Sequence, residues 1–130
     1  TLSRRAVITD LQCDPASRVA EHVSLADRSS ALIVAPATAN MIGKMASGIA
    51  DDILSTTVLS FSGPVFIAPA MNTVMWQHPV VQRNAAALRE LGCRIIGPES
   101  GTLADGREGT GRMAPPAAIA EEVLRVVNGG

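Results

Sequence analysis

The sequence predicts an α/β domain built on a parallel sheet. The alternation of strands and helices predicts the fold class, and the length and composition predict a single globular domain. Short apolar runs typical of buried strands alternate with longer amphipathic stretches typical of helices. The chain has 130 residues, enough for one domain with a single core. Its composition is 47% hydrophobic and 18% charged, as in an ordinary globular protein. Strands that alternate with helices form parallel sheets joined by right-handed crossovers.

Four short segments are expected to be strands. "AVIT" (6–9) is a plausible short strand at the start of the chain. "ALIVAPA" (31–37) and "GPVFIAPA" (63–70) are continuous apolar runs, as expected of strands buried on both faces of a sheet. "RIIGP" (94–98) is a further short strand.

Three longer segments are expected to be helices. Apolar residues recur at helical spacing over 40–61, with an interruption expected near Gly48. The segment 78–93 has Pro79 at its start and a glycine at its end, the usual asymmetry of helix termini. The segment 115–130 is a last helix with glycine past its end.

Composition excludes several classes of function. Lys and Arg total 11 against 12 acidic residues, without a basic run, so a nucleic-acid partner is not expected. No apolar run reaches the roughly 18 residues of a membrane span. Cys13 and Cys93 are expected to be free thiols in a cytoplasmic protein. No spacing of metal ligands occurs, so no metal is expected.

Three loops follow predicted strands: "PATAN" (36–40), "PAMN" (69–72) and "GPESGTLADGREGTGRM" (97–113). The carboxyl ends of parallel strands meet at one edge of a sheet, where ligands of α/β proteins bind. The convergence of these loops therefore predicts a binding site.

The first two loops each have two interpretations. Thr38 and Asn40 either cap the following helix or help its free N–H groups to hold an anion or a ring carbonyl. Asn72 offers a donor and an acceptor, and Met71 and Met75 offer polarizable contact to a flat ring. The alternative is that the methionines and the neighbouring tryptophan fill the core.

The third loop is rich in glycine and carries Arg107 and Arg112, so we expect it to be mobile and able to close over an anionic ligand. Asp105 in its middle is either an acid/base group or a turn former. Lys44, one turn into the predicted helix over 40–61, could approach a phosphate but is expected to be solvated.

Three motifs resemble a known family when taken in order and spacing. "APATANMIGKMASGIADDILSTT", "PAMNTVMW" and "GREGTGRM" are similar to segments of the flavin-dependent cysteine decarboxylases, and "HVSLA", which begins at His22, is similar to their histidine motif. That group includes phosphopantothenoylcysteine decarboxylase of coenzyme A synthesis and the peptidyl-cysteine decarboxylases of lantibiotic and related peptide pathways. The resemblance covers essentially the whole chain.

The resemblance implies a three-layer flavodoxin-like (Rossmann-type) parallel sheet that binds FMN. It implies a homotrimer, or a dodecamer built from trimers, with the active site between subunits. By motif match, His22 corresponds to the catalytic base and Asn72 to the residue that holds the substrate carboxylate. FMN contacts are implied for Thr38, Ala39, Asn40, Met71 and Met75. Substrate contacts are implied for Asn72, Met75, Gly109, Arg112 and Met113.

The chemistry implied by the resemblance suits these residue types. The cysteine side chain loses two electrons to FMN and becomes a thioaldehyde. That group is an electron sink beta to the carboxylate, so CO2 leaves and an enethiolate forms. The cofactor provides the difficult step, and the protein positions and polarises the substrate. A neutral imidazole at His22 can take a proton near pH 7.

Two departures from the family pattern shape the prediction. The family's N-terminal strand-helix unit, with its Gly-Ser phosphate-binding turn, has no counterpart in this sequence, so 1–130 is expected to be the C-terminal two-thirds of a larger flavoprotein domain. The coenzyme A enzymes carry "ACG" in the flap, where cysteine protonates the enethiol. Here the matching residues are "ADG", with Asp105 in the middle. A carboxylate is ionised at pH 7 and cannot replace that acid unless its pKa is raised.

The predicted function is therefore oxidative decarboxylation of a C-terminal peptidyl cysteine to an enethiol. The first alternative is phosphopantothenoylcysteine decarboxylase, with Asp105 as a substitute acid. The second alternative is a non-catalytic flavoprotein that regulates a partner, against which the presence of His22 argues.

Overall fold

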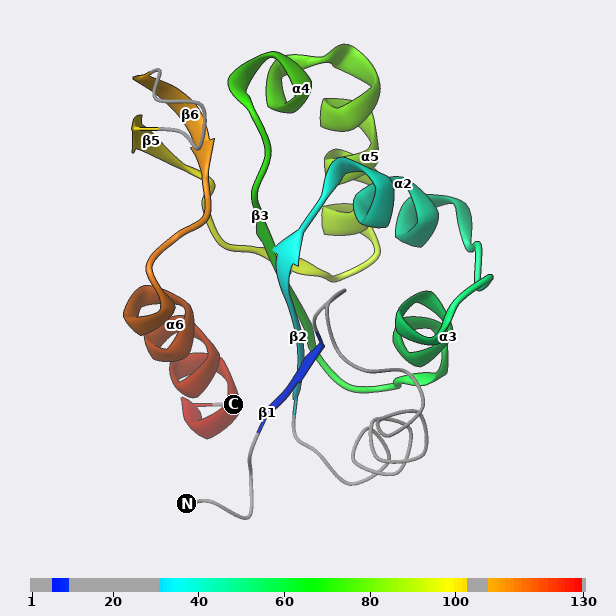
Figure 1. Ribbon diagram of the computed structural model, residues 1–130. Helices are drawn as coiled ribbons and strands as arrows, with labels where there is room; N and C mark the ends of the chain where they lie inside the picture. Colours follow the sequence, from blue (N-terminus) through cyan, green and yellow to red (C-terminus); the bar gives the residue numbers. More distant parts are fainter. Residues whose placement is uncertain (1–5, 10–30, 103–107, 130) are drawn as a thin grey trace.

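The computed structural model describes residues 6–9, 31–102 and 108–129. Its main sheet has four parallel strands in the order β1-β2-β3-β4 (Figure 1). These strands are β1 (Ala6–Thr9), β2 (Ala31–Ala37), β3 (Val65–Pro69) and β4 (Arg94–Ile95). The helices are α2 (Ala39–Ser47), α3 (Ile53–Ser60), α4 (Thr73–Gln77), α5 (Pro79–Glu90) and α6 (Pro116–Gly129). The predicted α/β fold with a parallel sheet is confirmed.

The two central strands supply half of the buried hydrophobic residues because both of their faces are covered. Ile33 pairs with Phe66 across β2 and β3, and every residue of β3 is buried. Successive side chains of a strand point to opposite faces. Each strand of the central pair therefore contributes alternate residues to two separate clusters.

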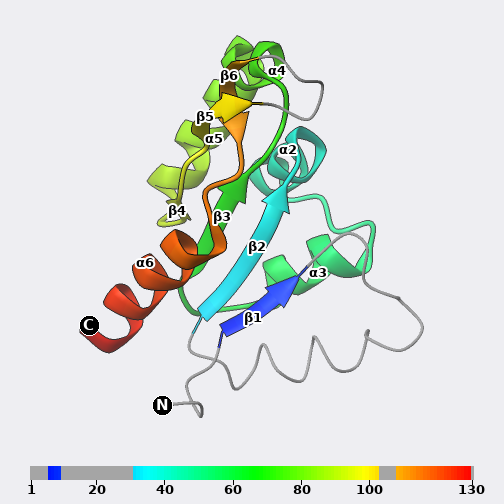
Figure 2. The same ribbon diagram turned by 60° about the vertical axis from the view of Figure 1, so that its left-hand side comes forward.

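One cluster lies beneath α2, α3 and α5. Helix residues such as Met41, Ile42 and Leu88 pack there with Leu32 and Ile67 of the sheet. The other cluster lies beneath α6, where Ile119 and Val123 pack against Ile33 and Phe66. Helices thus cover both faces of the sheet (Figures 1 and 2), and the three-layer arrangement is confirmed.

The expected helix over 40–61 is divided into α2 and α3. Gly48 ends α2 with a φ of 73°, and its backbone N–H donates to carbonyls of the last turn. A left-handed conformation of this kind favours glycine, as in many helix C-terminal caps. Asp52 then begins α3 by accepting from the backbone N–H of Ser55 at 2.7 Å. The interruption predicted near Gly48 is confirmed.

The segment 97–113 differs from its prediction as an irregular loop. It contains an antiparallel hairpin of β5 (Glu99–Thr102) and β6 (Glu108–Arg112). The hydroxyl groups of Ser100 and Thr110 lie 3.1 Å apart across the hairpin. These strands are polar and rich in glycine, so they lack the apolar alternation by which a strand is predicted from sequence.

Three further features of the described part of the chain concern membrane spans, metal ligands and cysteines. None of its helices is long and apolar enough to cross a membrane. Within the same residues, no group of three or more His, Cys, Asp or Glu side chains is placed to hold a metal ion. Cys93 is a free, half-buried thiol, while Cys13 lies outside the described residues.

Candidate functional site

The carboxyl ends of β2 and β3 lie side by side and bring two of the predicted loops together. Ala37 pairs with Pro69, and the backbone N–H of Ala70 donates to the carbonyl of Ala37 at 3.0 Å. Strand β2 leads directly into α2, and β3 leads into α4 through residues 70–72 (Figure 1). Two helix N-termini therefore meet at the same edge of the sheet.

The first loop ends in the cap of α2. Thr38 is the N-cap residue, and its hydroxyl oxygen accepts from the backbone N–H of Met41 at 3.1 Å. Asn40 is not a cap but lies within the first turn, with an exposed side chain. The backbone N–H groups of Ala39 and Asn40 have no intrahelical acceptor, as in any first turn. They are available to a ligand at this edge.

The second loop ends in the cap of α4. The side-chain oxygen of Asn72 accepts from the backbone N–H of Met75 at 2.9 Å. Asn72 is exposed, Met71 is half-buried and Met75 has 43% of its surface exposed. No residue of α4 is buried. The core-filling interpretation is therefore wrong for Met75, which remains accessible to a ligand, whereas Met71 packs against the core cluster beneath α2, α3 and α5.

The cap has a consequence for the chemistry of Asn72. Its side-chain oxygen is engaged by the helix, so the two hydrogens of its amide nitrogen remain as donors. A donor next to a helix N-terminus, where the helix dipole is positive, suits a carboxylate. The arrangement can hold an anionic group without a charged side chain.

Thr73, which follows Asn72, carries an unusual hydroxyl group. Its oxygen is buried and has no hydrogen-bond partner in the described part of the structure. A buried polar group without a partner costs about 1–3 kcal/mol. A ligand that reached this hydroxyl would relieve that cost. Sequence reasoning missed Thr73, because its burial depends on tertiary packing.

The hairpin is tied to the second loop by the backbone. The N–H of Met71 donates to the carbonyl of Gly111 at 2.9 Å, which places β6 against the start of α4. Gly111 has a φ of 154°, a conformation that L side chains rarely adopt. A Cβ built on Gly111 would overlap the carbonyl oxygen of Met71 and lie 3.3 Å from the carbonyl carbon of Asn72. The absence of a side chain at Gly111 permits this close approach.

Replacing Gly111 by alanine should displace the hairpin from the second loop. Backbone atoms on the opposing segment cannot rotate away as a flexible side chain would, so we expect a loss of more than about 2 kcal/mol in the free energy of unfolding. The matched control is Gly48→Ala, since Gly48 also has a positive φ but nothing within 4 Å of an added Cβ. Urea unfolding of both variants is the measurement. Equal losses would show that backbone strain alone, without the clash, accounts for the effect.

The other predicted residues of the hairpin region lie in β6 or directly after it. Gly109 is half-buried in β6, and the guanidinium group of Arg112 lies against Gly101, 2.8 Å from the position of an added Cβ. Met113 packs against the core cluster beneath α6. Their assignment as substrate contacts remains a prediction. His22 and Asp105 lie outside the described residues.

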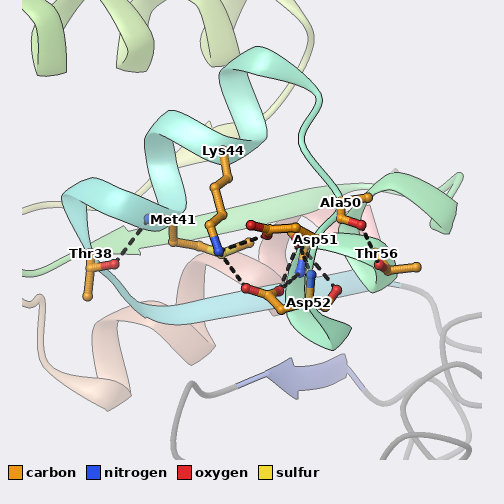
Figure 3. A network of polar contacts seen from close by, with 8 residues as sticks. Thr38, Met41, Lys44, Ala50, Asp51, Asp52 and Thr56 are labelled. Atoms are coloured by element: carbon orange, nitrogen blue, oxygen red, sulfur yellow. Dashed lines mark hydrogen bonds and ion pairs between the residues drawn. The ribbon is translucent and has the colours of Figure 1, made fainter.

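Lys44 is held by two carboxylates instead of being solvated (Figure 3). Its ammonium nitrogen lies 2.9 Å from Asp51 and 2.6 Å from Asp52. The hydrogen bond from Lys44, followed by that from the backbone of Ser55, lowers the pKa of Asp52 to about 2. The hydrogen bonds that Lys44 donates to Asp52 and to Asp51 raise the pKa of Lys44. These ion pairs join α2 to the start of α3, and Lys44 is not free to bind a phosphate.

Asp52→Asn should reduce stability at neutral pH and have little effect in acid. Asparagine can still cap α3, so the substitution removes mainly the charge. A carboxylate whose pKa is lowered from 3.8 to about 2 stabilises the fold above pH 3.8, and this contribution is lost as the pH falls towards 2. Because the group is partly exposed, we expect a difference of about 1 kcal/mol or less.

Urea unfolding of both proteins at pH 7 and at pH 2.5 checks this pH dependence. Asp51→Asn is the matched control, because Asp51 also pairs with Lys44 but caps no helix. If the difference in free energy of unfolding between Asp52→Asn and the wild type is the same at pH 2.5 as at pH 7, the stabilising role of the Asp52 carboxylate is contradicted.

Comparisons with known proteins identify a family and related proteins. The family model described as Flavoprotein matches residues 1–128. A cysteine/cysteine sulfinic acid decarboxylase from an unknown prokaryotic organism is 49% identical over 124 residues, which are 95% of this chain and 34% of that protein. The chain therefore spans about a third of the length of that curated relative.

Two solved structures share the fold. A PPC decarboxylase mutant, with serine in place of a cysteine, was solved in complex with pantothenoylaminoethenethiol; it aligns with a TM-score of 0.78 and 38% identity, over 85% of this chain and 61% of that one. The FMN-dependent cysteine decarboxylase SpaF aligns with a TM-score of 0.67 and 39% identity, over 82% of this chain and 57% of that one.

Proposed function

Since this chain belongs to the Flavoprotein family, we propose that it forms part of an FMN-dependent decarboxylase that acts on a cysteine carboxylate. The observation that carries the proposal is the meeting of the α2 and α4 N-termini with β6 at one edge of the sheet. Relatives described as cysteine decarboxylases support the reaction class.

The residues at this edge fit the flavin ring of FMN. The N–H groups of Ala39 and Asn40 are donors without an intrahelical acceptor, and the buried hydroxyl of Thr73 lacks a partner in the described structure. Met71 and Met75 offer polarizable side chains that are not fully buried. When bound, FMN would accept two electrons from the cysteine side chain.

The protein's own residues would then position the substrate and move a proton. Asn72 would donate its amide hydrogens to the substrate carboxylate, because its oxygen is engaged in the cap of α4. As a neutral imidazole, His22 would accept a proton from the substrate. The strand β6, fixed to Met71, would limit access of water to the same edge.

For the substrate, we propose a C-terminal peptidyl cysteine and an enethiol as the released product. Asp105 stands where the resembled coenzyme A enzymes carry cysteine, and an ionised carboxylate is a poor proton donor to an enethiolate. A related PPC decarboxylase mutant holds pantothenoylaminoethenethiol, which is an enethiol. A related site can therefore accommodate this product.

The second candidate is a phosphopantothenoylcysteine decarboxylase of coenzyme A synthesis. The complete "GREGTGRM" motif and the 38% identity to a PPC decarboxylase favour it. In that case Asp105 would act as the acid that protonates the enethiolate. A non-catalytic flavoprotein regulator remains the third reading, and the presence of His22 argues against it.

We also propose that the site is completed in a homotrimer, or in a dodecamer built from trimers. Val74, Met75 and Val80 are large apolar side chains exposed on and just after α4, beside the candidate site. Exposed apolar residues that gather beside a site are suited to contact with another copy of the chain. We further propose that the protein is cytoplasmic, as expected from its two cysteines.

The test uses the full-length protein with two substrates, a peptide that ends in cysteine and phosphopantothenoylcysteine. The protein should be yellow, with flavin absorbance released by heat. The expected product is the peptide lighter by CO2 plus two hydrogens, with flavin absorbance bleached until oxygen restores it. Mass spectrometry of the products is the measurement.

The other possible outcomes distinguish the alternative functions. A colourless protein that takes up no added FMN would overturn the flavoprotein proposal. A product lighter by CO2 alone, made from phosphopantothenoylcysteine without bleaching, would favour the coenzyme A enzyme. Asp105→Cys should shift the product towards the fully reduced thiol if the missing proton donor is what stops the reaction.

A further inference from the structure

An open groove of about 470 Å³ lies at the β4 edge of the sheet. Its walls come from the end of α5, the segment 93–96 and the first turns of α6. Figure 2 shows β4 between the C-terminal end of α5 and α6. The volume lies within the roughly 300–1,000 Å³ of small-molecule sites.

The groove is separate from the candidate functional site. Helix α5 begins at Pro79, directly after α4, whereas Arg89 of the groove lies in its last turn. A helix rises about 1.5 Å per residue, so the ten residues between them correspond to roughly 15 Å. A ligand in the groove would therefore not occupy the edge formed by Asn72 and Gly111.

The lining of the groove carries two arginines and one acidic side chain. Arg89 and Arg94 are exposed and form no ion pair within the described residues. The one acidic side chain of the lining, Glu122, is engaged by Arg125 at 2.5 Å. That hydrogen bond, together with a smaller effect of the charge on Arg94, lowers the pKa of Glu122. The groove therefore retains an excess of positive charge.

The groove is also lined by apolar side chains. Cys93, Ile95 and Ile96 are half-buried, and Ala118 of α6 lines the groove as well. Burial raises the pKa of the Cys93 thiol, so this side chain is uncharged at neutral pH. A lining that combines guanidinium groups with apolar side chains suits a ligand that is apolar at one end and anionic at the other.

We propose that this groove binds a small organic anion, with its carboxylate or phosphate at Arg89 and Arg94 and its apolar body on Cys93, Ile95 and Ala118. Arginine recognises these anions through paired hydrogen bonds in one plane. A peptide added to the sheet edge is the less suitable occupant, because β4 has only two residues to pair with it. This second site goes beyond the proposed decarboxylase and does not depend on it.

The test is a fluorine NMR titration of the full-length protein with trifluoromethyl-benzoate. The matched neutral probe is trifluoromethyl-benzyl alcohol. We expect saturable binding of the benzoate, at least about tenfold tighter than that of the alcohol. Arg89→Gln and Arg94→Gln should each weaken benzoate binding by about tenfold. Arg83→Gln should leave it unchanged, since Arg83 is exposed on α5 but does not line the groove.

Protection of Cys93 from alkylation would show that the ligand lies in the groove. Saturating benzoate should slow the alkylation of Cys93 by iodoacetamide, measured by mass spectrometry of the peptide that contains it. Absence of saturable binding, equal binding of the alcohol, or affinity that both arginine variants leave intact would each overturn the proposal. Binding of an acidic peptide in place of the benzoate would overturn it as well.

Discussion

Replacing Asn72 by aspartate should lower the kcat/KM of decarboxylation by on the order of 1,000-fold, mainly through KM. The proposed role of Asn72 is to donate its amide hydrogens to the substrate carboxylate. Aspartate has no such donor at neutral pH, and a hydrogen bond to a charged group contributes about 1.5–3 kcal/mol. The new negative charge also faces the negative charge of the substrate, and like charges in contact cost several kcal/mol.

The fold should survive this substitution, which makes the kinetic result interpretable. Asp is as good an N-cap as Asn, so its carboxylate can accept from Met75 as the amide oxygen does. A negative charge at the start of α4 is also favourable to the helix dipole. Urea unfolding should therefore show a change within about 1 kcal/mol, and the protein should still bind FMN.

Asn72→Ser is the matched control for this prediction. Serine also caps the helix but lacks both the amide donors and the charge. We expect a loss of about 10- to 100-fold in kcat/KM, between the wild type and Asn72→Asp. If Asn72→Asp keeps the wild-type KM for a cysteine substrate, Asn72 does not hold the carboxylate.

Replacing His22 by asparagine should lower kcat by about 100- to 10,000-fold, the range for loss of a positioned general base. Asparagine is polar but takes up no proton near pH 7. FMN content should be unchanged, because none of the flavin contacts proposed above involves His22. The measurements are CO2 release at saturating substrate and the absorbance of bound flavin.

The other histidine of the chain provides the control. The ring nitrogen Nδ1 of His78 accepts from the backbone N–H of Val80 at 3.1 Å and caps α5. Asparagine is also a good cap, so His78→Asn should keep near-normal turnover. Near-normal turnover of His22→Asn, or an equal loss in His78→Asn, would remove His22 from the catalytic role.

Much of the candidate site could be predicted because its residues carry local signals. Thr38 precedes a predicted helix and has a side chain that can cap it, as the structure shows, whereas helix α4, which Asn72 caps, was not predicted. The residues that were missed carry no such signal. Thr73 is notable only because its hydroxyl is buried, and Gly111 only because Met71 lies against it.

The ion pairs of Lys44 with Asp51 and Asp52 could not be predicted from the sequence either. A lysine on a helix is usually solvated, and the sequence around Lys44 contains nothing that predicts otherwise. The two acids that bind it follow Gly48, which ends α2 and turns the chain back. Contact between these groups depends on the direction of the chain after the glycine, which the residue types do not specify.

The sequence by itself determined the alternation of the main strands and helices and the parallel sheet, and it predicted the edge at which the candidate site lies. A continuous apolar run indicates a buried strand, and apolar residues at helical spacing indicate an amphipathic helix. Both patterns are local, because they involve residues that are close together in the sequence. Only the tertiary structure decided that 97–113 contains a hairpin and that Gly111 meets Met71, 40 residues earlier in the chain. Such contacts follow from backbone geometry and register, which polar, glycine-rich segments leave unspecified because glycine tolerates many conformations.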